Sequence, residues 1–446
     1  MMLRRRTLLG LALAGGLSRV VAAPKTAGAD AVLDAELAAI ATDPACQLSS
    51  LSVMAIRHGK RVYERQFGQR VIAADGVEAK PTTARTMYRI ASISKMMTTI
   101  GVMKLIEEGK LALDTDLGDY FGFAVRNPAF PARVVSLRML LTHTSSLRDS
   151  AGYSWSNDKP LKSVLVPGEP LFGKGEMWDA AHAPGAYFTY CNLNWGVIGT
   201  LMEKVTGERF DRLMKRLLLD PLGLHGGYNP SELSAEDLDN VAVLYRKRTT
   251  DTEVWNPDGP WIPQADNYGG RAPAPPAGIE HYVIGANATP FSPTGGLRIS
   301  AHDMGTVMLM LINDGRHEGR QILKPASLKL MFTRQWTYDG RGGNGDTNNG
   351  LFNAWGLGNQ QFPEQADKGM LLVEGGGFPA VGHLGDAYGL MTVFVVDLAG
   401  KNGMVALVSG TSTDPEASKG RYSSLAPFQE KILTAMYRRA ILAKAS

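Results

Sequence analysis

The chain has 446 residues, 44% of them hydrophobic and 20% charged, which is typical of a soluble globular protein with a sizeable core. Its net charge of +4 is small and its basic residues are dispersed, which argues against a nucleic-acid-binding protein. Only Cys46 and Cys191 occur, so a disulfide framework is excluded. A bridge between the two is chemically allowed in an oxidising compartment, but isolated cysteines are more often small buried residues.

The first residues predict an export signal. Arg4–Arg6 precede the apolar run Leu8–Leu17, which is too short to span a bilayer stably. The adjacent arginines resemble a twin-arginine signal, and a general secretory signal is the second interpretation. Cleavage after Ala23 or Ala29 fits the small residues, and Ala29 is favoured because Pro24 hinders the first site. We expect a periplasmic or secreted protein with no stable membrane anchor.

The next segments predict a helix, a hairpin and a second helix. Apolar spacing and strand-like alternation place the helix at Ala31–Ala41 and the paired strands at Leu51–Arg57 and Arg61–Gln66, with the turn at residues 58–60. A largely buried helix follows at Ser92–Glu108, and Gly109 stops it.

The rest of the chain adds helices in the middle and strands near the end. The predicted helices are Leu193–Thr206, Phe210–Leu218 and the terminal Pro427–Leu442, and the predicted strands are Met391–Asp397 and Met404–Ser409. Strands at both ends with helices between them predict an α/β (α+β) fold. Its antiparallel sheet is built from both chain ends and flanked by helices, with a mainly helical region inserted.

We therefore expect an export signal at 1–29 and one catalytic domain at 30–446. Its sheet subdomain takes in about 30–110 and 290–446, and its helical subdomain about 111–289. Two long stretches, Arg148–Gly185 and Arg246–Pro293, are predicted to be loops. Loops of this length form either walls of a site or mobile surface, and the sequence favours neither.

The chemistry is carried first by the Ser-x-x-Lys motif at Ser92 and Lys95. On a helix, a separation of three places both side chains on one face, where a lysine with a lowered pKa can take the serine proton. Ser156 begins a second copy of the motif, but Pro160 follows it and its surroundings are predicted to be loop. Context therefore selects Ser92.

Two further motifs follow in order. The only Tyr-x-Asn places Tyr190 and Asn192 before a helix, where a phenol can relay the serine proton and an amide can hold both the lysine and a substrate carbonyl. The third, residues 382–385, contains His383 and Gly385, and its glycines permit close approach of substrate to backbone. Another histidine, His143, is predicted to be structural.

Together these segments resemble the serine β-lactamase and penicillin-binding family, specifically the branch of class C β-lactamases, D-alanyl-D-alanine carboxypeptidases and related esterases and peptidases. The resemblance runs from about Leu51 to the C-terminal helix, and it includes the segment at 141–147, in which Ser146 replaces the usual glycine.

The resemblance implies that Ser92 is the nucleophile, with Lys95 and Tyr190 as a coupled acid–base pair. Asn192 orients substrate, and the backbone N–H groups of Ser92 and Asp386 form the oxyanion hole.

The third motif departs from the β-lactamase pattern. Its first residue is usually lysine, whereas His383 is largely neutral near pH 7. Asp386, beside the oxyanion site, could repel an anionic substrate, although its side chain could also point away. The histidine resembles the esterase, amidase and peptidase relatives, and a carboxylate at Asp386 could also prefer an amine-bearing substrate.

The predicted function is hydrolysis of an ester or amide bond in a small molecule or peptide through an acyl-serine, without metal or organic cofactor, since no histidine spacing suggests a zinc site. The alternatives are a β-lactamase or D-alanyl-D-alanine carboxypeptidase and, in a different class, a non-catalytic binding protein on the same fold. The sequence leaves the oligomeric state open.

Overall fold

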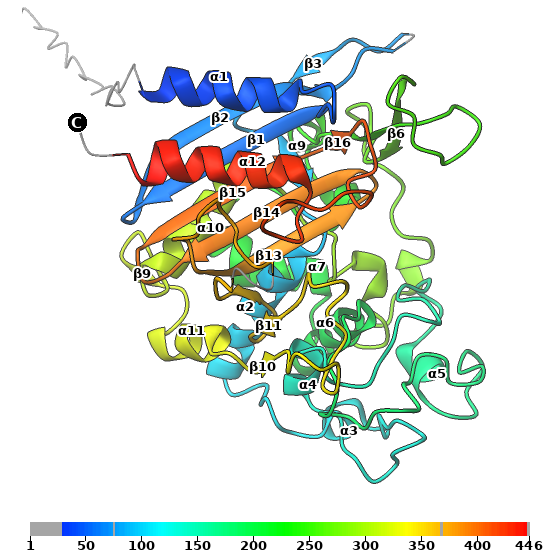
Figure 1. Cartoon of the computed structure of the whole chain (residues 1–446). Helices are drawn as coiled ribbons and strands as arrows, with labels where there is room; N and C mark the ends of the chain where they lie inside the picture. Colours follow the sequence, from blue (N-terminus) through cyan, green and yellow to red (C-terminus); the bar gives the residue numbers. More distant parts are fainter. Residues whose placement is uncertain (1–28, 75, 366–368, 444–446) are drawn as a thin grey trace, which may run out of the picture.

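The computed structural model describes residues 29–443, except residue 75 and residues 366–368 (Figure 1). Its centre is one antiparallel sheet in the order β10-β11-β12-β13-β14-β15-β1-β2-β3. The strands of this sheet are β1 (Ser50–Arg57), β2 (Lys60–Val71), β3 (Lys80–Pro81), β10 (Trp336–Thr337), β11 (Ala354–Trp355), β12 (Gln360–Phe362), β13 (Ala380–Ala387), β14 (Leu390–Asp397) and β15 (Asn402–Val408).

Both chain ends contribute to this sheet, since β1 from the N-terminal part pairs with β15 from the C-terminal part. The smaller sheets use β4 (Met87–Arg89) with β7 (Arg298–Ser300), β8 (Arg316–His317) with β9 (Arg320–Gln321), and β16 (Gly410–Thr411) with β5 (Leu244–Lys247) and β6 (Trp261–Ala265). The predicted fold class and the origin of its sheet are confirmed.

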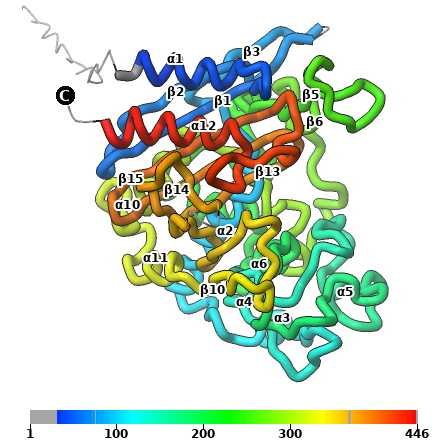
Figure 2. Tube along the Cα trace, viewed as in Figure 1, coloured from blue at the N-terminus to red at the C-terminus, as the bar shows by residue number. Residues whose placement is uncertain are grey.

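Helices cover both faces of the sheet or fill the insertion between its strands. They are α1 (Ala29–Ala41), α2 (Ile93–Glu107), α3 (Leu117–Phe121), α4 (Leu137–Leu141), α5 (Leu161–Leu165), α6 (Leu193–Thr206), α7 (Phe210–Met214), α8 (Asp220–Leu222), α9 (Ala235–Asp239), α10 (Ala301–Ile312), α11 (Pro325–Phe332) and α12 (Pro427–Met436). The first and last helices lie side by side over one face of the sheet, as Figure 2 shows in blue and red. The opposite face packs against α10 and α2.

Strand β1 shows why the sheet is buried on both faces. Because successive side chains of a strand point to opposite faces, Val53 and Ala55 join the apolar cluster under α1 and α12. Met54 and Ile56 join the larger cluster that contains α2 and α10. Because β1 is covered on both faces, it is buried almost throughout, and from Val53 to Ile56 its side chains are continuously apolar instead of alternating as in a half-exposed strand.

The predicted hairpin is present, with a tighter turn and a longer second strand. Arg57 pairs with Lys60, which leaves only His58 and Gly59 in the turn. Both have positive φ, at 48° and 74°, as a two-residue hairpin turn of this type requires. The second strand continues to Val71, five residues beyond its predicted end.

Several helix bounds also differ from prediction. The helix expected at Phe210–Leu218 is α7, which continues as a π-helical turn at Lys215–Leu219. The terminal helix likewise changes from α12 to a π-helical turn at Tyr437–Ile441.

The two long loops are partly ordered. Arg246–Pro293 contains β6, which pairs with β5, so the expectation of an unbroken loop was wrong there. Arg148–Gly185 contains only the short α5.

Residues 1–28 of the predicted export signal lie outside the described part of the chain. The first described element, α1, begins at Ala29. The subdomain limits near 110 and 290 stay a prediction. Within residues 29–443, apart from the gaps named above, no helix is long and apolar enough to cross a membrane.

Candidate active site

Ser92 lies at the N-terminus of α2, as its motif predicted. The residue before it, Ala91, has φ of 45°, a left-handed conformation that is unusual for alanine, and so the chain turns sharply into the helix. Gly385 of β13 packs directly against this turn. A Cβ at position 385 would lie 2.5 Å from the Ile90 carbonyl oxygen and 2.3 Å from Thr392 Oγ1.

The motif glycines therefore let backbone approach backbone. The sequence assigned them to close approach of substrate, but Gly382 faces the Phe394 carbonyl oxygen, only 1.9 Å from where its Cβ would be. The two glycines hold β13 against β14 and the Ser92 turn.

Lys95 is fully buried one turn into α2, and its Nζ has three oxygen neighbours. They are Ser92 Oγ at 2.9 Å, Asn192 Oδ1 at 2.8 Å and the Thr294 carbonyl oxygen at 3.1 Å. Burial lowers the pKa of Lys95 to about 7, partly opposed by the negative charge of Asp149. A large fraction of this lysine is thus uncharged near neutral pH.

Tyr190 completes the group around Ser92, and its phenol interacts with the Ser92 side chain. Its ring stacks on His143 at 4.5 Å and on Phe352 at 4.8 Å, and Lys95 Nζ lies 4.9 Å from the ring centre. Because the surrounding protein desolvates the phenol, the pKa of Tyr190 is raised well above its ordinary value.

Asn192 connects Lys95 to the first turn of α6. Its Oδ1 accepts hydrogen bonds from Lys95 Nζ and from Thr294 Oγ1, both at 2.8 Å. Its Nδ2 donates to Asp149 Oδ2 at 2.9 Å. The structure thus brings four predicted residues from two helix starts into direct contact.

The third motif lies within β13, the strand just before β14. His383 is 1% exposed, and its Nδ1 lies 2.6 Å from the Leu384 carbonyl oxygen. Nδ1 is therefore the donor, and burial together with the charge of Lys95 lowers the pKa of His383 to about 3. The imidazole is neutral, as predicted, with its Nε2 acceptor unpartnered.

Asp386 is among the residues that line the cleft and is exposed to solvent. Desolvation by the surrounding protein and the nearby carboxylate of Glu416 raise the pKa of Asp386 to about 6. Strand β12 pairs with β13 only as far as Gly382. Beyond it, residues 383–387 have no partner from β12 on that edge of β13, and they line the cleft.

The cleft has a volume of about 820 Å³. Both long loops contribute to its wall, the first through Tyr153 and Ser154 and the second through Thr289, Pro290 and Ser292. Of the two interpretations left open for these loops, the structure favours the wall.

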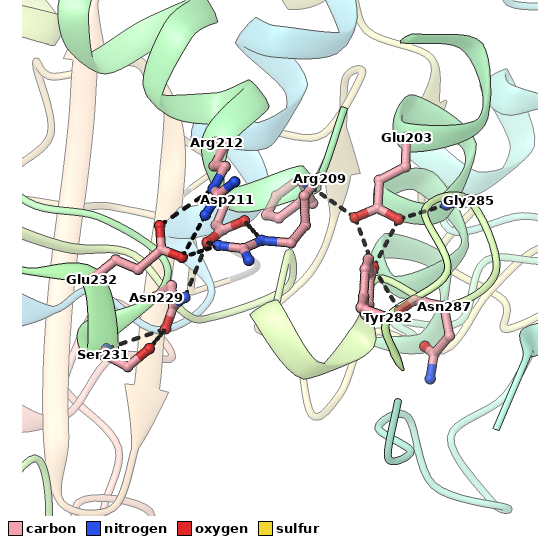
Figure 3. A network of polar contacts seen from close by, with 11 residues as sticks. Glu203, Arg209, Asp211, Arg212, Asn229, Ser231, Glu232, Tyr282, Gly285 and Asn287 are labelled. Carbon is pink, nitrogen blue, oxygen red and sulfur yellow. Dashed lines mark hydrogen bonds and ion pairs between the residues drawn. The ribbon is translucent and has the colours of Figure 1, made fainter. Parts of the chain in front are cut away.

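A buried polar network fixes the second loop to α6 (Figure 3). Glu203, near the C-terminal end of α6, accepts hydrogen bonds from the Tyr282 hydroxyl at 2.7 Å and from the Phe210 and Gly285 backbone N–H groups at 2.7 and 2.9 Å. The Tyr282 hydroxyl oxygen also lies 2.9 Å from the Asn287 carbonyl oxygen. The same helix that begins at Asn192 thus anchors the loop that leads into the cleft wall.

Residues outside the three motifs also support the site. Arg89 and Arg298 both bind the buried carboxylate of Asp266, which ties the second long loop to β4 and β7 just before Ser92. No local pattern marks Asp266, because its partners are distant in sequence. Asp149 and Thr294 were likewise missed.

The structure also shows where the other residues discussed from the sequence lie. Ser156 is exposed and hydrogen-bonded to Asp158, away from Lys95. Both cysteines are free, and only Cys191 is fully buried. His143 is buried with its Nδ1 accepting from the Cys191 N–H, so it supports Tyr190 structurally. Ser146 has φ of 66°, which explains why glycine suits that position.

A family model described as Beta-lactamase matches residues 30–426. The chain belongs to the beta-lactamase family. Membership agrees with the predicted enzyme class, a serine hydrolase that acts through an acyl-enzyme. Across the described part of the chain, no cluster of three or more His, Cys, Asp or Glu side chains could hold a metal ion.

The relatives that this beta-lactamase family member matches are named as different kinds of protein. Penicillin-binding protein 4* of Bacillus subtilis is 26% identical over 44% of this chain and 41% of its own length. The match to lovastatin esterase of Penicillium rubens is 28% identical over 61% of this chain and 65% of the esterase. The chain thus spans less than two thirds of either relative.

Solved structures share the fold. The hydrolase EstCE1 has a TM-score of 0.63 and 23% identity, covering 92% of this chain and 99% of EstCE1. D-amino acid amidase from Ochrobactrum anthropi has a TM-score of 0.61 and 17% identity, covering 91% and 99%. The octameric penicillin-binding protein homologue from Pyrococcus abyssi has a TM-score of 0.61 and 22% identity, covering 86% and 74%.

Proposed function

We propose that the chain is an exported serine hydrolase that cleaves an ester or amide bond of a small molecule or peptide through an acyl intermediate on Ser92. The carrying observation is the environment of Lys95 Nζ. Asn192 Oδ1 and the Thr294 carbonyl oxygen can only accept hydrogen bonds. A neutral amine has two N–H groups, which these two oxygens satisfy, and its lone pair is then left for the Ser92 hydroxyl 2.9 Å away.

In this mechanism Lys95 takes the Ser92 proton while Ser92 Oγ forms a bond to the substrate carbonyl carbon. The lowered pKa of Lys95 and the raised pKa of Tyr190 support the lysine as the base and the phenol as the acid. Tyr190 protonates the leaving group as its bond to the carbonyl carbon breaks, and Lys95 then returns the proton to the phenol. Water, deprotonated by the same pair, hydrolyses the acyl-serine.

The oxyanion would be held by the backbone N–H groups of Ser92 and Asp386. The first opens α2, where helix N–H groups favour negative charge, and the second lies on the part of β13 that faces the cleft. Asn192 keeps Lys95 in place and has one N–H beyond its bond to Asp149 for a substrate carbonyl.

The charges in the cleft support esters and neutral amides over β-lactams. His383 supplies no cation where β-lactamases usually carry lysine, since its pKa is about 3. Among the charged residues that line the same cleft, Asp386 and Glu416 are negative and Arg89 and Lys419 are positive, so no excess of cations replaces the missing lysine. The relatives named as an esterase and a D-amino acid amidase agree with this preference. The alternative, a β-lactamase or D-alanyl-D-alanine carboxypeptidase, draws its support from the relative named a penicillin-binding protein.

Export rests on the sequence. Arg4–Arg6 and the apolar run after them support a twin-arginine-like signal and a periplasmic or secreted enzyme. The alternative of another class, a binding protein without turnover, is disfavoured by the contacts among Ser92, Lys95, Tyr190 and Asn192.

The deciding experiment labels purified protein with a fluorophosphonate probe and with penicillin, and measures hydrolysis of a short p-nitrophenyl ester. Ser92→Ala should lose labelling and turnover and remain folded, because the start of a helix tolerates loss of one hydroxyl far better than acyl transfer does. Ser156→Ala is the matched control and should behave as wild type. Unchanged turnover in Ser92→Ala would refute the proposal, and no acylation of the wild type would support the binding protein.

A further inference from the structure

Asp149 lies in the first long loop, yet its carboxylate is placed against the start of α6. Its two oxygens accept hydrogen bonds from the backbone N–H groups of Asn192 and Leu193 and from the Asn192 side-chain Nδ2, all at 2.9 Å. The Cys191 thiol adds a weaker contact at 3.3 Å.

Asp149 supplies hydrogen-bond acceptors for N–H groups at the start of α6 that have no partner within the helix. The first N–H groups of a helix have no partner within it, and the residue at the N-cap usually supplies one from its side chain. At α6 that residue is Asn192, and its side chain makes no capping bond. Its amide is instead turned toward Lys95. Asp149 caps the helix from outside and so leaves Asn192 free for the site.

Asp149 also determines which way the Asn192 amide faces. A carboxylate only accepts hydrogen bonds, so the NH2 group of Asn192 must face Asp149 and Oδ1 must face Lys95 and Thr294. A reversed amide would set an oxygen against the carboxylate and N–H groups against the lysine, and no bond of the present set would survive.

The charge of Asp149 reaches Lys95 as well. The titratable groups that act on or face the lysine come from the segments before α6 and after α4 and from β13. They are Tyr190, Cys191, His143, Asp149 and His383. Asp149 is the one carboxylate in this set, and it opposes the effect of burial on the lysine.

We propose that Asp149 is a positioning residue of this site, which fixes the Asn192 amide and, through it, aims Lys95 at Ser92. The inference rests on the proposed function, in which Lys95 is the base.

The test compares Asp149→Asn with wild type in p-nitrophenyl acetate hydrolysis from pH 5 to pH 9. We expect kcat/KM to fall about tenfold or more at high pH, as is typical when a hydrogen bond to a charged group is lost. The acid limb of the pH–rate profile, where kcat/KM falls as Lys95 becomes protonated, should move to lower pH, because loss of the negative charge lowers the pKa of Lys95 further. Asp158→Asn, an exposed carboxylate of the same loop, is the matched control and should change neither.

A role confined to folding would lower the rate at every pH without moving the limb, and that result would overturn the inference. A double-mutant cycle with Asn192→Ala adds a second criterion: losses that do not add support action through Asn192, and additive losses overturn it. Should Asp149→Asn fail to fold, Asp149→Ser keeps a capping oxygen without the charge and is measured in the same way.

The inference and the proposed function fail differently. Turnover that survives Ser92→Ala removes the site that Asp149 would position. If Ser92→Ala has no turnover but Asp149→Asn has the rate and the pH–rate profile of the wild type, only the role of Asp149 is overturned.

Discussion

Replacing Glu203 by glutamine should change how the free energy of unfolding depends on pH. Glu203 is 0% exposed, and burial outweighs its three hydrogen-bond donors, raising the pKa of this carboxyl from its ordinary 4.5 to about 7 (Figure 3). A carboxyl with a raised pKa binds its proton more tightly in the folded state. Its contribution to stability is therefore fully present below pH 4.5 and is lost as the pH rises through 7.

The expected magnitude follows from these two values. A tenfold change in proton affinity is worth about 1.4 kcal/mol, so between pH 5 and pH 8 the wild type should lose roughly 2–3 kcal/mol that Glu203→Gln does not lose. Lys95 and Asp386 also titrate in this range, with pKa values of about 7 and 6. The quantity to compare is thus the difference between variant and wild type, in which their contributions cancel.

Denaturant unfolding at several pH values, followed by tryptophan fluorescence, would measure this difference. Glu232→Gln is the matched control from the neighbouring cluster, where Arg209 and Arg212 lower the pKa of Glu232. That carboxyl stays ionised in both states above pH 5, so its removal should leave the slope unchanged. Parallel pH profiles for Glu203→Gln and wild type would refute the electrostatic reasoning.

Two further predictions concern specificity and export. His383→Lys should shift the ratio of kcat/KM values from a p-nitrophenyl ester toward a chromogenic cephalosporin, modestly if the new ion pair is exposed, since such pairs are worth about 0–1 kcal/mol. A wild type that already prefers the cephalosporin strongly would contradict the argument from His383. Replacing all three residues of Arg4–Arg6 by lysine should strand the precursor in the cytoplasm, and N-terminal sequencing of wild type should find Asp30 first. An uncleaved cytoplasmic wild-type chain would contradict export.

The sequence predicted the sheet and the residues at the starts of α2 and α6 because both depend on local patterns. Apolar runs identify strands covered on both faces, and Ser92 and Lys95 are separated by one helical turn. The hairpin turn could be placed only within one residue, because strand register depends on which partners meet.

What escaped prediction depends on contacts between distant segments. Asp266 binds Arg89 across 177 positions and Asp149 binds Asn192 across 43, and neither carboxylate stands in a motif. The motif glycines were assigned to close approach of substrate, and the structure shows that they also pack closely against β14 and the Ser92 turn, which a sequence alone does not reveal. Strand β6 was missed because its proline and the surrounding glycines and asparagines are typical of a loop.

In the proposed mechanism, the geometry also explains why the second motif has an amide at position 192. A lysine base must be buried enough to lose its proton near neutral pH, but a carboxylate in direct contact would stabilise the ammonium and raise the pKa again. Asn192 separates the two charges: its oxygen meets Lys95 and its nitrogen meets Asp149. The carboxylate can therefore hold the helix start and orient the amide while Lys95 keeps a pKa of about 7. A carboxylate at position 192 itself would pair with the lysine directly, and the proton would stay on the base.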